Sequence, residues 1–205
     1  MPVIKHVKGR VPLGDAERFE EATWDVAGVQ FTPHQGELHR LITHLTPSEA
    51  MTRKLILSGR LPVEGIDAAR GMRTLDAGCG IGCLVHALQE GGVNAYGVDL
   101  SGACVRRGLG EGVRNLRTGD LRKLPYADGF FDVVTCNNTF DTAMDATAAR
   151  QLSRVVREGG VVCMTSSDVS KDMETVAGEG LQLVGELSRV DGRRGYLVFK
   201  KLLVS

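Results

Sequence analysis

The chain has 205 residues, enough for one globular domain with a full hydrophobic core. Its 25 Lys and Arg are balanced by 25 Asp and Glu, whereas a protein that neutralises many phosphates normally carries a basic excess. Met1 to Arg10 show no signal-peptide pattern, and no run approaches the ~18 apolar residues of a membrane-spanning helix. We therefore expect a cytoplasmic protein that binds neither nucleic acid nor a membrane.

The chain divides near residue 70, and the part before it has helical signals. Two similar segments, Thr32-Pro33-His34-Gln35 and Thr46-Pro47-Ser48-Glu49, each place a Thr before a Pro and a Gln or Glu at the third helical position. This is the capping-box pattern with Pro at the first helical position. The first helix is predicted to run to about Leu45. The second is predicted to end near Ser58, with Gly59 as the stop.

From Arg73 onward, β-rich runs alternate with helical stretches. The predicted strands are 73–77, 94–99, 114–118, 131–137, 161–166, 181–189 and 195–203, and the predicted helices are 81–90, 101–111, 142–157 and 170–178. Such alternation implies a parallel sheet with helices on both faces. Asp191-Gly192 predicts a turn between the last two strands. The expected fold class is α/β, a doubly wound, mostly parallel seven-stranded sheet with one antiparallel strand from a C-terminal hairpin.

A glycine-rich loop follows the first of these strands. Gly78, Gly80 and Gly82 are spaced Gly-x-Gly-x-Gly, tighter than the Gly-x-Gly-x-x-Gly loop that binds dinucleotides. Asp76 stands directly before the loop, where it would repel a pyrophosphate but suits a cation such as an ammonium or a sulfonium. The loop alone is weak support for a ligand, because a tight turn between a strand and a helix has the same composition.

Two further acids stand at the ends of the next predicted strands. Asp99 closes the second strand, 23 residues after Asp76, and an acid near this distance can accept both ribose hydroxyls of a nucleoside. Asp120 follows the third strand. Ligands of doubly wound sheets bind beyond the carboxyl ends of the strands. Three acids in register with those ends therefore predict a nucleoside site.

The same segments resemble the successive motifs of class I (Rossmann-like) SAM-dependent methyltransferases, where SAM is S-adenosylmethionine. Three segments of the chain are similar to the SAM-binding motifs of that family: Leu75–Gly82, Tyr96–Ser101 and Gly119–Leu121. Residues 124–134 and 154–160 are similar to the segments around the fourth and fifth strands of that family, although Glu158 replaces a Pro found in many relatives. The resemblance covers roughly residues 70–203.

The resemblance implies that the cofactor is SAM and that its methionine part lies against the glycine loop. Backbone groups of the loop would line the methionine part, at Gly78, Cys79, Gly80 and Gly82. Asp76 would sit behind the loop and reach the amino group through water.

The resemblance assigns the rest of SAM to the ends of the later strands. Asp99 would bind the ribose hydroxyls, with Leu100 on one side of the adenine ring and Leu121 on the other. Asp120 would accept a hydrogen bond from the adenine amine. Asn137, at the end of the fourth strand, would face the sulfonium region with its backbone carbonyl or its side chain.

In this family the segment before the glycine loop often covers the SAM site. By that likeness residues 1–70 form an N-terminal helical lid or cap segment, and residues 71–205 form the SAM-binding domain. A general base is needed only if the acceptor must lose a proton. The candidate catalytic residues are His34, His39, Asn138 and Asp141, with Tyr126 as a further candidate base.

The expected function is methyl transfer to a small-molecule acceptor by in-line displacement. The Asp/Asn-Pro-Pro-Tyr signature of many amino-directed methyltransferases is replaced by Cys136–Phe140, which argues against nucleobase amines. There is no long insertion of the kind that builds a separate substrate domain. The five cysteines lack a Cys-x-x-Cys spacing, so no metal site is expected. A homodimer is also expected, and no sequence feature tests this expectation.

Two alternatives stay open at this point. An enzyme of the same fold can act on the aminobutyrate arm of SAM, by transferring it or closing it to azetidine-2-carboxylate, and then releases methylthioadenosine. A SAM-binding partner subunit without catalysis is the other alternative, although the complete glycine loop and all three acids argue against a degenerate site.

Overall fold

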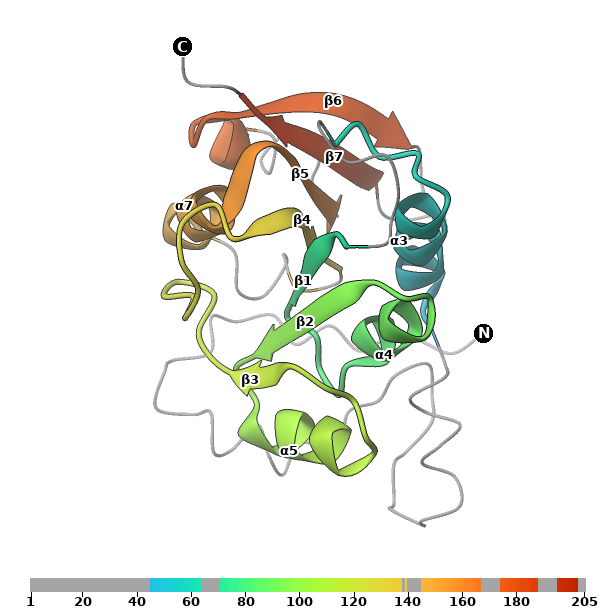
Figure 1. Cartoon of the computed structure of the whole chain (residues 1–205). Helices are drawn as coiled ribbons and strands as arrows, with labels where there is room; N and C mark the ends of the chain where they lie inside the picture. The colour runs from blue at the N-terminus through green and yellow to red at the C-terminus, as the bar shows by residue number, and fades with distance from the viewer. Residues whose placement is uncertain are drawn as a thin grey trace, which may run out of the picture.

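A computed structural model describes residues 45–63, 71–137, 139, 145–166, 174–187 and 195–202 of the chain. They form a seven-stranded sheet with the order β3-β2-β1-β4-β5-β7-β6 (Figure 1). The strands are β1 (Arg73–Ala77), β2 (Asn94–Asp99), β3 (Leu116–Thr118), β4 (Phe131–Cys136), β5 (Val156–Ser166), β6 (Leu181–Leu187) and β7 (Gly195–Lys201). Neighbours among β1 to β5 are parallel, and β7 is antiparallel to both β5 and β6. The predicted fold class, including its closing hairpin, is confirmed.

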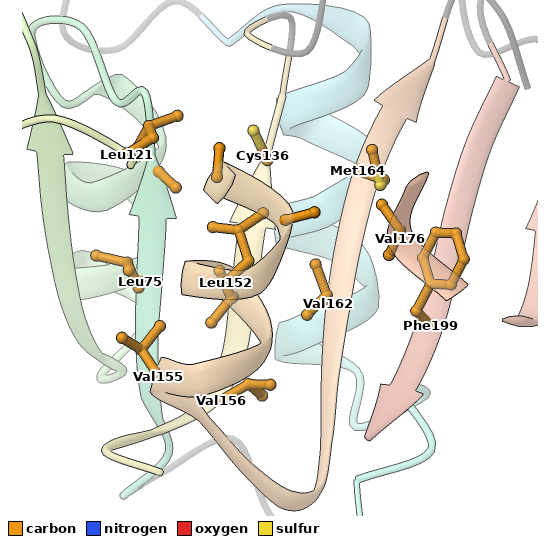
Figure 2. Packing of buried hydrophobic residues seen from close by; sticks show 14 of the residues in the cluster. Leu75, Leu121, Cys136, Leu152, Val155, Val156, Val162, Met164, Val176 and Phe199 are labelled. Carbon is orange, nitrogen blue, oxygen red and sulfur yellow. The ribbon is translucent and has the colours of Figure 1, made fainter. Parts of the chain in front are cut away.

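The helices pack on both faces of the sheet. They are α3 (Pro47–Leu57), α4 (Cys83–Glu90), α5 (Gly102–Gly110) and α7 (Ala146–Val155). On one face, α7 places Leu152 and Val155 in a cluster with Leu75 and Val162 of the sheet (Figure 2). On the other face, α3, α4 and α5 contribute buried residues to a second apolar cluster with the sheet. Burial of one side of each helix against the sheet is the main source of stability in this architecture.

The second predicted helix start is confirmed in detail. The Thr46 backbone N–H donates to Glu49 Oε2 at 2.7 Å, and the Glu49 N–H donates to Thr46 Oγ1 at 3.3 Å. This reciprocal pair is a capping box, which satisfies two backbone donors that a helix leaves open at its start. The helix ends at Leu57, just before Ser58 and Gly59, as predicted.

Several predicted element boundaries are wrong by a few residues. α4 begins at Cys83 instead of 81, because Gly80 and Gly82 have φ of 54° and 88°, outside helical geometry. β3 begins at Leu116 instead of 114, directly after Asn115, whose φ is 61°.

α7 and β5 also differ from the prediction. α7 ends at Val155 instead of 157, and β5 begins at Val156 instead of 161. Val156 pairs with Phe131 of β4, and Arg157 Nε donates to Asp132 Oδ1 of β4 at 2.7 Å. These contacts bring the chain onto the sheet at the last residue of the helix.

The predicted helix that begins at Thr32 lies outside the described residues. The cap role assigned to residues 1–70 and the division near residue 70 therefore stay predictions. Within that segment, α3 packs on the sheet beside α4, with Ile56 fully buried. No helix in the described ranges is both long and apolar enough to cross a bilayer.

Candidate functional site

The glycine loop connects the carboxyl end of β1 to the start of α4. The backbone N–H groups of Gly78 and Cys79 both donate to the carbonyl of Val98 in β2, at 2.7 and 3.1 Å. A Cβ at Gly78 would overlap the side chain of Thr139, whereas a Cβ at Gly80 would meet no described atom within 4 Å. The open part of the loop is therefore at Gly80, where a ligand can approach the backbone directly.

Asp99, at the end of β2, is hydrogen-bonded to this loop. Its Oδ2 accepts from the Gly80 N–H at 2.7 Å, and its Oδ1 accepts from the Ser101 N–H at 2.9 Å. Burial raises the pKa of Asp99, although these two N–H donors act in the opposite direction. Each carboxylate oxygen can accept more than one hydrogen bond, so Asp99 keeps acceptor capacity toward a ligand beside Gly80. Leu100 follows it with 41% of its surface exposed.

Asp76, at the end of β1, is almost completely buried on the sheet face that α3 covers. Its Oδ1 accepts from the Thr135 hydroxyl at 2.8 Å. Burial, followed by the nearby Glu49 carboxylate of α3, raises the pKa of Asp76 to about 7. A cation near this carboxylate would favour its charged form.

Asn137 follows β4 and is 7% exposed. Its Oδ1 accepts from the Thr52 hydroxyl of α3 at 3.3 Å, and the Thr52 hydroxyl also lies 2.8 Å from the hydroxyl of Tyr196 in β7. Its Nδ2 is buried and has no hydrogen-bond partner within the described part of the chain. Buried donors are normally paired, so this atom is available to donate to a ligand at the end of β4.

Asp120 and Leu121, at the end of β3, have a different environment. Both carboxylate oxygens of Asp120 are held by Arg122, whose Nε lies 3.0 and 3.1 Å from them and whose Nη2 lies 2.9 Å from Oδ2. The hydrogen bonds from Arg122 lower the pKa of Asp120. Leu121 is buried in the apolar cluster under α7. The adenine contacts assigned to these two residues stay predictions.

The side chain of Cys79 faces away from the open part of the loop. A Cβ built on Gly97 of β2 would lie 2.7 Å from Cys79 Sγ. Burial raises the pKa of this thiol well above its usual value. Only the backbone of Cys79 is therefore available to a ligand, and its thiol is not an activated nucleophile.

The four main catalytic candidates, His34, His39, Asn138 and Asp141, lie outside the described residues. Tyr126 packs among Tyr96, Phe130 and Phe131, and burial raises its pKa to about 12. A phenol with this pKa is a poor acceptor of protons from a substrate near neutral pH, because its anion scarcely forms. The suggestion of Tyr126 as a base is therefore not supported.

Four residues of the site were not predicted from the sequence. They are Glu49, Thr52, Thr135 and Tyr196. Glu49 was identified only as a helix-capping residue. Ser48 and Thr52 are one helical turn apart on the buried face of α3, and a polar pair at this spacing on a helix that must bury one face is the signal that was available.

A family match covers the glycine loop and the ends of β1 to β4 in this site, but not α3 or β7. Residues 75–164 match the family described as "Methyltransferase domain". The chain is 31% identical over 121 residues to a demethylmenaquinone methyltransferase of Mycolicibacterium vanbaalenii, covering 58% of this chain and 53% of that protein. It is 32% identical over 99 residues to a malonyl-[acyl-carrier protein] O-methyltransferase of Pseudescherichia vulneris, covering 47% and 39%. The chain thus spans about half, or less, of the length of these relatives.

A solved structure shares the whole architecture. The TehB-like SAM-dependent methyltransferase of Corynebacterium glutamicum superposes with a TM-score of 0.64 at 17% identity, over 92% of this chain and 98% of that one. This likeness concerns the fold alone. The family match, which runs from β1 into β5, identifies residues 75–164 as part of a methyltransferase domain, and the shared sheet is that of SAM-dependent methyltransferases.

Proposed function

We propose that the protein transfers a methyl group from SAM to a small-molecule acceptor by in-line displacement. SAM supplies a methyl group that its sulfonium has already activated, so the enzyme has mainly to bind and align the two reactants. This proposal concerns the whole protein, whereas the comparisons cover about half of each relative.

The hydrogen bond between Asp99 and Gly80 carries the proposal. A nucleoside whose ribose hydroxyls bind Asp99 would lie directly beside the open backbone of Gly80, because the Gly80 N–H donates to Asp99 Oδ2 at 2.7 Å. Leu100 offers an exposed apolar surface next to the same carboxylate. The face of a flat aromatic ring such as adenine would cover it, and removing this apolar surface from water is favourable. The residues present therefore fit SAM.

The end of the site beside β1 and β4 fits the amino-acid part of SAM. The Asp76 carboxylate can pair with the ammonium group, and that pairing would hold Asp76 ionised despite its raised pKa. Beside Asp76, the glycine loop has no side chain at Gly80 that could obstruct the ligand. On the acceptor side, Asn138, Asp141, His34 and His39 remain the proposed residues for orienting the acceptor or removing its proton.

The relatives support a small acceptor. By their names, one methylates a demethylated menaquinone and the other a malonyl group on a carrier protein. In this chain, the segments after β4 and β5 are too short to build a separate substrate domain. We therefore propose a compact acceptor pocket.

The test is product analysis after incubation with methyl-labelled SAM. The purified protein is incubated with SAM alone and with each of three acceptors: a demethylated naphthoquinone, a malonyl thioester and a catechol. We expect S-adenosylhomocysteine to form only when an acceptor is present, and Asp99→Ala to reduce its formation. Formation of methylthioadenosine would instead indicate that the enzyme acts on the aminobutyrate arm of SAM. Binding of SAM without turnover across the panel would favour a SAM-binding subunit.

A further inference from the structure

The buried face of α3 changes character along the helix. Ser48, Thr52 and Ile56 are its buried residues, each one turn from the next. Ile56 belongs to the apolar cluster between the helices and the sheet. Thr52 is equally buried yet polar, and a buried hydroxyl is costly unless it is hydrogen-bonded. The partners of Thr52 therefore explain why a polar residue occupies this position.

Three elements meet at the Thr52 hydroxyl. Its Oγ1 lies 2.9 Å from the carbonyl of Ser48, 2.8 Å from the Tyr196 hydroxyl of β7, and 3.3 Å from Oδ1 of Asn137. Tyr196 is also fully buried, and it has a further side-chain hydrogen bond with Cys163 of β5. This buried network joins α3 and the end of the sheet to the carboxamide of Asn137.

The network determines which end of the Asn137 carboxamide is free. Because Oδ1 faces Thr52, Nδ2 is left as a buried donor without a partner in the described ranges. Asn137 is close to the glycine loop, since the Thr139 hydroxyl is 3.0 Å from the Asn137 carbonyl and 3.4 Å from the Gly78 carbonyl. An unpaired donor at this place calls for an acceptor on the ligand.

The chemistry of the two polar groups beside the loop is complementary. Asp76 offers a carboxylate oxygen, which suits an ammonium group, and Asn137 offers an N–H, which suits a carboxylate. The amino-acid end of SAM carries one ammonium and one carboxylate. A donor from Asn137 would therefore pair with the group that Asp76 repels.

We propose that Thr52 and Tyr196 are positioning residues, which hold the Asn137 carboxamide so that Nδ2 donates to the carboxylate of SAM. The inference rests on the proposed function, because it takes SAM as the ligand. It assigns α3, outside the matched residues 75–164, an influence on cofactor binding that acts through Asn137.

The test compares SAM with decarboxylated SAM, which lacks only the carboxylate. Both are titrated calorimetrically into the wild-type protein and into Thr52→Val, which keeps the shape of the side chain but removes its hydroxyl. Thr52→Val should bind SAM about tenfold more weakly, the range of one hydrogen bond to a charged group, and should bind decarboxylated SAM like the wild type. Thr52→Ser should restore SAM binding. Tyr196→Phe should lower SAM affinity by about threefold, because Thr52 keeps its contact with Asn137.

Two further variants separate this role from a structural one. Asn137→Asp replaces the donor by an anionic oxygen and should weaken SAM more than Thr52→Val does, again sparing decarboxylated SAM. Ser153→Ala removes another buried hydroxyl, which donates to the Glu179 carbonyl at 2.6 Å on the α7 face. It should lower the melting temperature without changing either affinity.

The outcomes are distinct. Equal losses for both ligands in Thr52→Val and Asn137→Asp, or no loss for either, would overturn the positioning role. If Thr52→Val does not fold, the test uses Asn137→Asp, and the ratio of its affinities for SAM and decarboxylated SAM decides whether the Asn137 donor binds the carboxylate. Failure of the wild-type protein to bind either ligand would instead overturn the proposed function.

Discussion

The two ends of the candidate SAM site contain the same type of residue in opposite environments. Asp76, beside β4, is 3% exposed, and its pKa is raised to about 7. Asp120, beyond β3, has a side chain that is 26% exposed, and its pKa is lowered by Arg122. Both lie at or just beyond the carboxyl end of a strand, so this position alone does not fix the charge that a ligand meets.

The difference follows from the place of each strand in the sheet. β1 lies between β2 and β4, and the face of the sheet that carries Asp76 is covered by α3 and α4, whereas β3 is the edge strand. A central strand end is shielded by neighbours on both sides, and burial disfavours a charge there. At the edge, solvent and a flexible arginine can both reach the carboxylate. The methionine end is therefore expected to be closed and the adenine end open.

The largest expected effect concerns the buried end. Because the folded pKa of Asp76 is near 7 and its ordinary value is 3.8, the folded protein binds a proton between these pH values that the unfolded chain has released. The free energy of unfolding should then decrease as pH rises through this interval, by up to about 1.4 kcal/mol per pH unit, and level off above it. Chemical denaturation of the ligand-free protein at several pH values measures this slope.

Asp76→Asn is the control for that slope. It cannot ionise, so the difference in stability between Asp76→Asn and the wild type should widen from pH 4.5 to pH 7 in favour of the variant. Parallel curves for the two proteins would mean that Asp76 titrates normally, and the contrast between the two ends would be lost.

The second effect is on SAM affinity at the centre of the site. Asp99→Ala removes an acceptor for the ribose hydroxyls and the partner of the Gly80 N–H, and should weaken SAM binding by about 1–3 kcal/mol. Calorimetric titration measures it. Asp99→Asn, which keeps one acceptor oxygen, should lose less. Unchanged affinity in Asp99→Ala would contradict the ribose assignment.

The third prediction sharpens the description of the open end. Leu100→Ala shortens an exposed side chain, so the free energy of unfolding should change by less than about 0.5 kcal/mol. SAM affinity should fall by about 1 kcal/mol, because adenine would otherwise cover this apolar surface. Thermal melting and calorimetry on the same sample distinguish the two effects. Equal losses in the free energy of unfolding and in the free energy of SAM binding would mean that Leu100 contributes to folding instead of binding.

The smallest effect is expected at Asp120. Arg122 already engages both of its oxygens, and the pair is partly exposed, so Asp120→Asn should change SAM affinity by less than about threefold. Arg122→Ala is the matched variant. If Asp120→Asn loses tenfold or more, the adenine amine must displace Arg122, and the edge of the sheet would bind SAM as strongly as its centre.

The parts of the protein that sequence alone determined are those with local signals. The glycine spacing, the acid at the end of β2 and the capping box of α3 each lie within a short segment, and the alternation of strands and helices allows few topologies. The pairing of Asp120 with Arg122, two positions apart, was also within reach of such reasoning. The predicted boundaries of helices and strands were wrong where a residue with positive φ, or a contact with β4, overrode the local sequence pattern.

Only the tertiary structure decided how the closed end of the site is built. Thr52 meets Asn137 across 85 positions and Tyr196 across 144, and no periodicity links residues so far apart. The raised pKa of Asp76 has the same origin, because its burial and the approach of Glu49 of α3 depend on how helices and sheet pack. Local sequence specifies elements and motifs, whereas burial and the pairing of polar side chains arise when those elements meet.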